Sequence, residues 1–129
     1  MPTHDEMVRT VEAYIAAFDR TDPDAVRNLF APDASVEDPV GTPAHVGHEA
    51  IHAFYAKSMQ TGAKLKLEGP VRTAGNSAAF AFSVRIGAGE QTMRIDVIDT
   101  FAFNDAGKVT AMRAYFSEAN FSKVDAANA

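Results

Sequence analysis

Residues 93–101 read MRIDVIDTF, an apolar and β-branched stretch that also contains two aspartates. Side chains alternate between the faces of a strand, so Asp99 shares a face with Val97 and Phe101, whereas Asp96 lies on the other face. Asp99 is then a buried structural acid, a catalytic group, or a sign that the stretch is not a strand. In apolar surroundings its pKa should rise, so that it could stay protonated and donate a hydrogen bond.

The segments around this stretch have the same two-residue period. Four strand-like runs follow one another: KLKLEGPVRT (64–73), SAAFAFSVRI (77–86), EQTMRIDVIDTFAF (90–103) and KVTAMRAYFSEANF (108–121). Short turn-forming sequences rich in glycine and asparagine separate them. This pattern predicts four strands in an antiparallel arrangement.

The beginning of the chain has a helical period instead. Thr3 and Glu6 have the spacing of a capping box, and apolar residues recur at helical spacing up to about residue 20. A short second helix is predicted to begin with Pro23 at its first position, and we expect Pro32 to end it.

A brief extended segment is predicted over residues 34–38, and a third helix from about Glu49 to near Gly62. Helices followed by hairpin-linked strands indicate the α+β class and one domain over residues 1–129. A curved sheet wrapped over amphipathic helices would leave an apolar pocket between them. We expect the tail, SKVDAANA (122–129), to be poorly ordered.

Composition narrows the possible functions. The 129 residues are 47% hydrophobic, enough for one core, and carry a formal charge of −5 with no basic run. The charge argues against nucleic acid and anionic membranes as partners. The chain has no cysteine, so a thiol nucleophile is excluded, and it has no apolar stretch of about 20 residues that could span a membrane. We therefore expect a cytoplasmic protein.

Asp38 and Tyr14 are two further polar residues on predicted apolar faces. In an extended segment 34–38, Asp38 points inward and Glu37 points to water. Asp38 could initiate a turn, or it could accept a proton at the edge of a pocket. Tyr14 could be an ordinary core aromatic, or its hydroxyl could reach the pocket in a network that Tyr55 extends.

Residues 48–52, HEAIH, match the H-E-x-x-H pattern of zinc metalloproteases. A zinc site of that kind needs the motif in a buried helix and a third ligand. Here the two histidines lie off the most apolar face of the predicted helix, and no third ligand follows. We expect no metal and interpret His45, His48 and His52 as solvated surface residues.

Five segments together resemble the ketosteroid isomerases of the NTF2-like superfamily: VEAYIAAF (11–18), VEDPVG (36–41), AFYAKS (53–58), DVIDTFAF (96–103) and MRAYFSEAN (112–120). The resemblance covers nearly the whole chain. It implies an NTF2-like cone, in which three N-terminal helices pack in a curved, mainly antiparallel sheet, and it implies a homodimer.

The resemblance also implies a mechanism. Asp38 corresponds to the general base, which moves a proton from C4 to C6 of a Δ5-3-ketosteroid and yields the conjugated Δ4-3-ketosteroid. Tyr14 and protonated Asp99 correspond to the oxyanion hole, which donates hydrogen bonds to the C3 oxygen of the dienolate. No metal or organic cofactor is required.

The expected steroid-binding residues are Phe54, Tyr55, Phe82, Phe101, Met112 and Phe116. The chain departs from some family members, which carry a tyrosine at the position of Phe30 and a tryptophan at that of Phe116. Another NTF2-like enzyme, such as a polyketide cyclase, and a non-catalytic binding module are the alternative interpretations.

Overall fold

The structure is a computed structural model that describes residues 1–125. Its α-helices are α1 (His4–Asp19), α2 (Pro23–Arg27) and α3 (His48–Gln60). Its strands are β1 (Phe30–Glu37), β2 (His45–Val46), β3 (Lys64–Leu67), β4 (Arg72–Ala74), β5 (Ser77–Ile86), β6 (Met93–Phe103), β7 (Val109–Tyr115) and β8 (Phe121–Lys123). Two short 3-10 helices, η1 (Gly89–Gln91) and η2 (Glu118–Asn120), precede β6 and β8.

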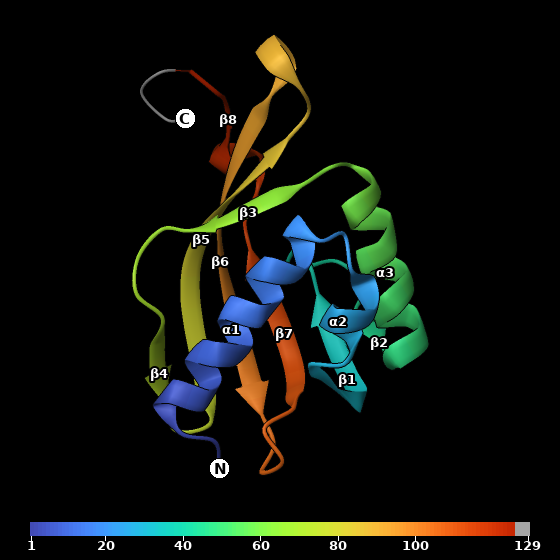
Figure 1. Cartoon of the computed structure of the whole chain (residues 1–129), viewed down its shortest axis with the longest axis vertical. Helices are drawn as coiled ribbons and strands as arrows, with labels where there is room; N and C mark the ends of the chain where they lie inside the picture. Colours follow the sequence, from blue (N-terminus) through green and yellow to red (C-terminus); the bar gives the residue numbers. More distant parts are fainter. Residues whose placement is uncertain (126–129) are drawn as a thin grey trace.

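The described strands form one sheet in the order β2-β1-β7-β6-β5-β3, with β4 paired to β5 and β8 paired to β6. All of these pairs are antiparallel except β1 with β7, which run parallel. The helices lie on one face of the curved sheet, and α1 crosses in front of its central strands (Figure 1). The expected α+β class and mainly antiparallel curved sheet are confirmed.

Helix α1 contributes one side of the core. It begins with the predicted capping box, in which Thr3 and Glu6 each bond to the other's backbone N–H. Its buried side chains recur every three or four residues: Met7, Val11, Tyr14, Ala17 and Phe18. The Tyr14 ring meets Tyr55 and Phe101 edge to face, with ring centroids 5.7 and 5.3 Å apart. These contacts hold Tyr14 between the other helices and the sheet.

The predicted role of Pro32 is wrong. Helix α2 ends at Arg27, and Pro32 lies inside β1. The pairing of β1 with β7 is irregular between Phe30 and Ser35, which is where Pro32 falls. Proline has no backbone N–H to donate, so a strand tolerates it where the hydrogen bonding to the neighbouring strand is interrupted.

The number and pairing of the strands also differ from the prediction. The run 64–73 is divided between β3 and β4, and the run 108–121 is divided between β7 and the start of β8. Residues 34–37 of the expected extended segment 34–38 belong to the longer β1, which pairs with a strand more than 70 positions away, and Asp38 follows the end of β1. Of the tail, Ser122 and Lys123 belong to β8, whereas residues 126–129 lie outside the described part.

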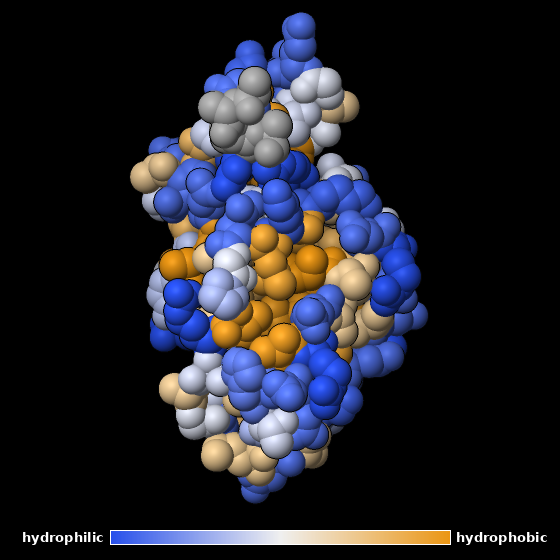
Figure 2. Space-filling model, turned by 60° about the vertical axis from the view of Figure 1, so that its left-hand side comes forward, coloured by the Kyte–Doolittle hydropathy of each residue, from blue (hydrophilic) through white to orange (hydrophobic). Residues whose placement is uncertain are grey.

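The surface is largely hydrophilic in the view of Figure 2, with hydrophobic residues gathered in the middle of that face. Within residues 1–125, no helix combines the length and the apolar composition needed to cross a membrane.

Candidate active site

A cavity of about 280 Å³ lies between the helices and the concave face of the sheet. Residues from α1, α3, β3, β5 and β6 form its wall: Tyr14, Phe18, Phe54, Tyr55, Ser58, Leu65, Phe82, Val84, Ile86, Ile95, Val97 and Asp99. Asp38, Thr61, Ala63 and Phe116 complete the lining from the adjoining loops. The wall is mainly apolar, and a few polar groups converge inside it, as in many small-molecule sites.

Asp99 reaches this cavity because of the alternation along β6. Ile95, Val97, Asp99 and Phe101 are buried, while Asp96 is exposed on the opposite face. The side chain is 1% exposed, and neither carboxyl oxygen has a hydrogen-bond partner within residues 1–125. Burial, with a smaller effect of the Asp38 charge, raises the pKa of Asp99 well above its ordinary value. The raised pKa favours the protonated form of Asp99, which has a proton to donate to a ligand.

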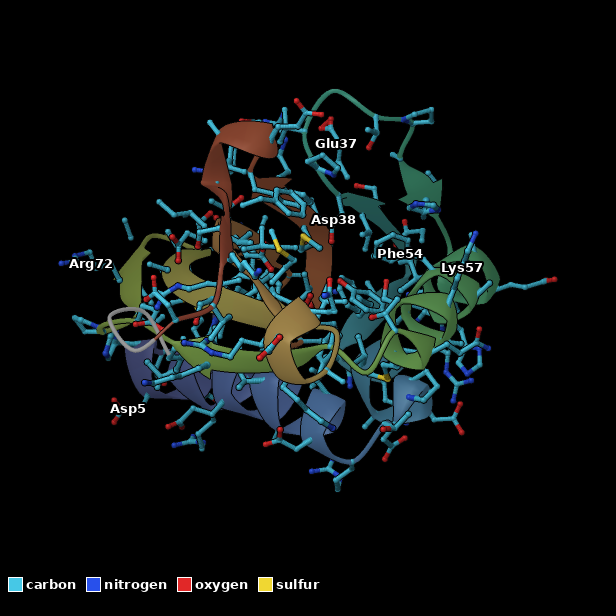
Figure 3. The ribbon with its side chains drawn as sticks, turned by 90° about the horizontal axis from the view of Figure 1, so that it is seen from above. Asp5, Glu37, Asp38, Phe54, Lys57 and Arg72 are labelled. Atoms are coloured by element: carbon cyan, nitrogen blue, oxygen red, sulfur yellow. The ribbon has the colours of Figure 1, made fainter. Side chains whose placement is uncertain are left out.

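Asp38 directly follows β1 and also lines the cavity. Its side chain is half-buried, and burial raises its pKa to about 6. The preceding Glu37 points away, with a carboxylate oxygen 3.3 Å from a guanidinium nitrogen of Arg113. Figure 3 shows the two acids diverging at the end of this strand. Asp38 is consequently an ionisable carboxylate near neutral pH, in contact with the cavity.

Tyr14 and Tyr55 bring two hydroxyl groups into the same cavity. Their oxygens are 3.0 Å apart and form a hydrogen bond between α1 and α3. Burial raises the pKa of both phenols, so both remain protonated. The ring centroid of Phe30 lies 6.1 Å from that of Tyr55. Phe30 has no hydroxyl group, so it cannot extend the hydrogen bond between Tyr14 and Tyr55.

The structure brings most of the predicted site residues together. The three catalytic candidates line the cavity, and so do four of the expected steroid-binding residues: Phe54, Tyr55, Phe82 and Phe116. Phe101 and Met112 are not among the lining residues and are completely buried in the core. The Phe101 ring packs against Tyr14 and Phe80, and Met112 lies directly opposite Phe101 on β7.

Several lining residues were not singled out from the sequence. For some, the signal was available: Val84 and Ile86 continue the face of Phe82 on β5, and Ser58 lies one helical turn after Tyr55. Ala63 and Leu65 gave no such signal, because their place depends on how β3 pairs with β5.

The three histidines near α3 are half-buried, and each has a partner within the protein that the sequence did not predict. His48 Nε2 is 2.8 Å from the Phe30 carbonyl oxygen, and His52 Nε2 is 2.7 Å from Asp24 Oδ1. The His45 ring stacks at a tilt on Phe54, with centroids 4.4 Å apart. Among the described residues, no three His, Cys, Asp or Glu side chains are grouped so that they could hold a metal ion.

The arrangement offers one proton acceptor and two proton donors around an apolar space. A carboxylate with a pKa near neutrality can take a proton from a weakly acidic C–H group and return it. Protonated Tyr14 and Asp99 can donate hydrogen bonds to an oxygen that becomes negative in the transition state. The site is suited to proton transfer beside a carbonyl group.

Three comparisons with known proteins agree with this architecture. Residues 11–112 match the family model of the SnoaL-like domain. The chain is 38% identical over 113 residues to a steroid Delta-isomerase of Nocardioides simplex, covering 87% of this chain and 90% of that protein. SalBIII, an epoxide hydrolase/cyclase-like enzyme of pyran ring formation in salinomycin, has a TM-score of 0.88 at 21% identity, covering 96% of this chain and 100% of SalBIII. The likeness to SalBIII concerns the fold alone.

Proposed function

The chain belongs to the SnoaL-like domain family, and on this premise we propose that it isomerises Δ5-3-ketosteroids to conjugated Δ4-3-ketosteroids. One observation carries the proposal: Asp38, Tyr14 and the unpartnered, buried Asp99 line a single apolar cavity. A buried acid without a hydrogen-bond partner destabilises a fold, so its presence in a cavity points to a partner that arrives with a ligand. The relative named as a steroid Delta-isomerase supports the same choice of substrate.

Asp38 is the general base in this proposal. Its carboxylate removes the proton from C4, next to the C3 ketone, and the electrons move onto the C3 oxygen as a dienolate forms. The protonated Asp38 then gives the proton to C6, and the double bond ends between C4 and C5. A pKa raised to about 6 makes the carboxylate a stronger base than an ordinary aspartate while leaving it mostly ionised at pH 7.

Tyr14 and Asp99 form the oxyanion hole in this proposal. Burial raises the pKa values of both groups, which favours the protonated forms that can donate. Donors fixed at the C3 oxygen stabilise the dienolate-like transition state more than the neutral ketone, which accelerates the reaction. Proton transfer within one substrate needs no redox change, so the residues of this chain can complete each step.

The remaining wall binds the hydrocarbon rings in this proposal. Phe54, Phe82, Val84, Val97 and Phe116 present apolar surface to the cavity. Transferring apolar surface from water contributes roughly 25 cal/mol per Å². The cavity volume of about 280 Å³ is near the lower limit of small-molecule pockets, roughly 300 Å³. The apolar lining suits a ligand with a largely hydrocarbon surface.

We also propose that the protein is a homodimer. Ile98 and Tyr115 lie directly opposite each other on β6 and β7, on the sheet face away from the helices. They are 50% and 45% exposed, which is unusual for large apolar side chains at the centre of a sheet. Sedimentation equilibrium of the protein and of Ile98→Asp tests this, since a monomeric wild-type protein would exclude the dimer.

The isomerase proposal is tested with androst-5-ene-3,17-dione, by following the ultraviolet absorbance of the conjugated enone that forms. The expected result is turnover by the wild-type protein and a large loss in Asp38→Asn. Absence of turnover by a protein with a cooperative unfolding transition would overturn the proposal.

A further inference from the structure

A second hollow adjoins the cavity on the outer side of α3. This groove has a volume of about 700 Å³ and is lined by His45, Ala50, Ala53, Phe54, Lys57, Ser58 and Thr61. Phe54, Ser58 and Thr61 line both spaces. In Figure 3, Phe54 lies between Asp38, which lines only the cavity, and Lys57, which lines only the groove. The two spaces are therefore neighbours that meet along α3.

The cavity extends from the catalytic groups toward this groove. Along β6, the lining runs from Asp99 through Val97 to Ile95, about 13 Å at roughly 3.3 Å per residue. Along α3, Ser58 and Thr61 follow Tyr55 by one and two helical turns, each of about 5 Å. A ring system with its ketone at Asp99 and Tyr14 thus directs its opposite end toward Ser58, Thr61 and the groove.

The boundary between the two spaces carries an unused polar group. The Thr61 hydroxyl donates to the Ser58 carbonyl oxygen over 2.6 Å. The hydroxyl of Ser58 itself makes no hydrogen bond to any of the described residues, and Ser58 lines both spaces. It is free to bond an oxygen atom of a ligand that passes from the cavity into the groove.

The groove carries the cationic side chain of Lys57, although the chain as a whole has a formal charge of −5. Lys57 is exposed and has no ion-pair or hydrogen-bond partner within residues 1–125. None of the residues that line the groove is acidic. Glu49, also on α3, lines a different hollow together with Arg27, His48 and His52. An anionic group in the groove would therefore meet Lys57 without a competing carboxylate in the lining.

Resting on the proposed function, we propose that the cavity and the groove form one extended site for ketosteroids whose far end bears a side chain ending in a carboxylate. The rings occupy the cavity, the side chain passes Phe54 and Ser58, and the carboxylate pairs with Lys57. Lys57 is then a specificity-determining residue, because it distinguishes an acidic side chain from a neutral one of the same length.

Three substrates separate the contributions of ring, side chain and charge: androst-5-ene-3,17-dione, 3-oxochol-5-en-24-oic acid, and the methyl ester of that acid. Enone formation is followed for each in the wild-type protein, in Lys57→Gln, and in Lys66→Gln as the matched control. Lys66 lies on β3, is exposed, and lines neither space.

In the wild-type protein, we expect a higher kcat/KM for the acid than for the ester. Lys57→Gln should reduce the ratio of acid to ester by roughly two- to fivefold, the range of exposed ion pairs. Added salt should reduce the same ratio in the wild-type protein. Lys66→Gln should leave the ratio unchanged.

The failure of this inference differs from the failure of the proposed function. If androst-5-ene-3,17-dione is turned over but the acid is not, the extended site is overturned and the isomerase proposal stands. The same holds if Lys57→Gln does not change the ratio of kcat/KM for the acid to that for the ester. No turnover of any of the three compounds overturns the proposed function and the inference built on it.

Discussion

The hydroxyl of Tyr14 lies 3.0 Å from the hydroxyl of Tyr55, although the first residue is on α1 and the second on α3. Both rings are buried, and both residues line the cavity. If Tyr55 donates to the Tyr14 oxygen, the Tyr14 proton is left to bond a substrate. A hydrogen bond that Tyr14 accepts also polarises it as a donor.

This relationship predicts unequal effects of removing the two hydroxyl groups. Tyr14→Phe removes a donor to the substrate oxygen and should lower kcat by about 10²- to 10³-fold. Tyr55→Phe removes only the supporting hydrogen bond, of roughly 0.5–1.5 kcal/mol, and should lower kcat by about two- to thirteenfold. Steady-state kinetics with androst-5-ene-3,17-dione measures both. A larger loss in Tyr55→Phe would mean that Tyr55 is the direct donor.

Asp38→Asn should remove most of the activity while the steroid still binds. The substitution keeps the shape of the side chain and removes the base, which contributes about 10²- to 10⁴-fold to kcat. The dissociation constant of the product, androst-4-ene-3,17-dione, should change little and can be measured by calorimetry. The matched control is Glu37→Gln, because Glu37 is adjacent but pairs with Arg113 away from the cavity. Near-normal turnover in Asp38→Asn would exclude Asp38 as the base.

The pH dependence of kcat/KM should follow the ionisation of Asp38. Burial raises its pKa to about 6, and only the ionised carboxylate can accept the C4 proton. Activity should therefore rise with pH through about 6 and become constant above it. Initial rates in buffers of constant ionic strength give the profile. A profile that is flat through this region would show that Asp38 does not control the reaction in this way.

Asp99→Asn should stabilise the protein relative to the wild type increasingly as the pH rises. The pKa of Asp99 is higher in the folded protein than in the unfolded chain, where it is about 3.9. Below about pH 3.9 the carboxyl is protonated in both states, and the wild-type protein keeps its full stability. As the pH rises from about 3.9 toward the folded pKa, only the unfolded state loses the proton, and the free energy of unfolding falls. The loss is at most about 1.4 kcal/mol per pH unit. Asparagine does not titrate, so the difference in unfolding free energy should grow with pH.

Urea unfolding of the wild type and of Asp99→Asn at several pH values measures this difference. The matched control is Asp96→Asn, which changes an exposed carboxylate on the opposite face of the same strand. If the difference between wild type and Asp99→Asn did not vary with pH, Asp99 would not be held protonated by the fold.

Removal of metal ions should not affect turnover. The Nε2 atoms of His48 and His52 contact the Phe30 carbonyl oxygen and the Asp24 carboxylate. His52→Gln should change the unfolding free energy by at most about 1 kcal/mol, the scale of exposed ion pairs, and should leave kcat unaffected. Rates are compared before and after dialysis against a chelator. If the chelator abolished activity and added zinc restored it, the HEAIH motif would have to be interpreted as a catalytic zinc site.

Local patterns predicted those features that depend on neighbours in the sequence. The capping box of Thr3 and Glu6 forms as expected, because its two hydrogen bonds join residues three positions apart. Alternation along residues 93–103 identified the buried face of Asp99 correctly. The roles assigned to the polar residues came from the resemblance, since alternation indicates which face a side chain occupies but not what it does.

Other features depend on pairing between distant segments. Pro32 was expected to end a helix, but pairing of β1 with β7 places it in a strand, because an interrupted ladder accepts a residue without an N–H. Phe101 and Met112 were expected in the pocket, but they pack on each other and on the aromatic core. No local pattern distinguishes an inward residue that lines a cavity from one that fills the core.

The sequence by itself determined the three helices, most of the extended segments, and the inward faces of Tyr14 and Asp99. The tertiary structure alone decided that Asp38, Tyr14 and Asp99 share one cavity, that Tyr55 bonds Tyr14, and that Lys57 stands beside its outer end. The reason is physical. The direction of a side chain follows from the local backbone, whereas the space that it enters is enclosed by residues brought together through long-range packing.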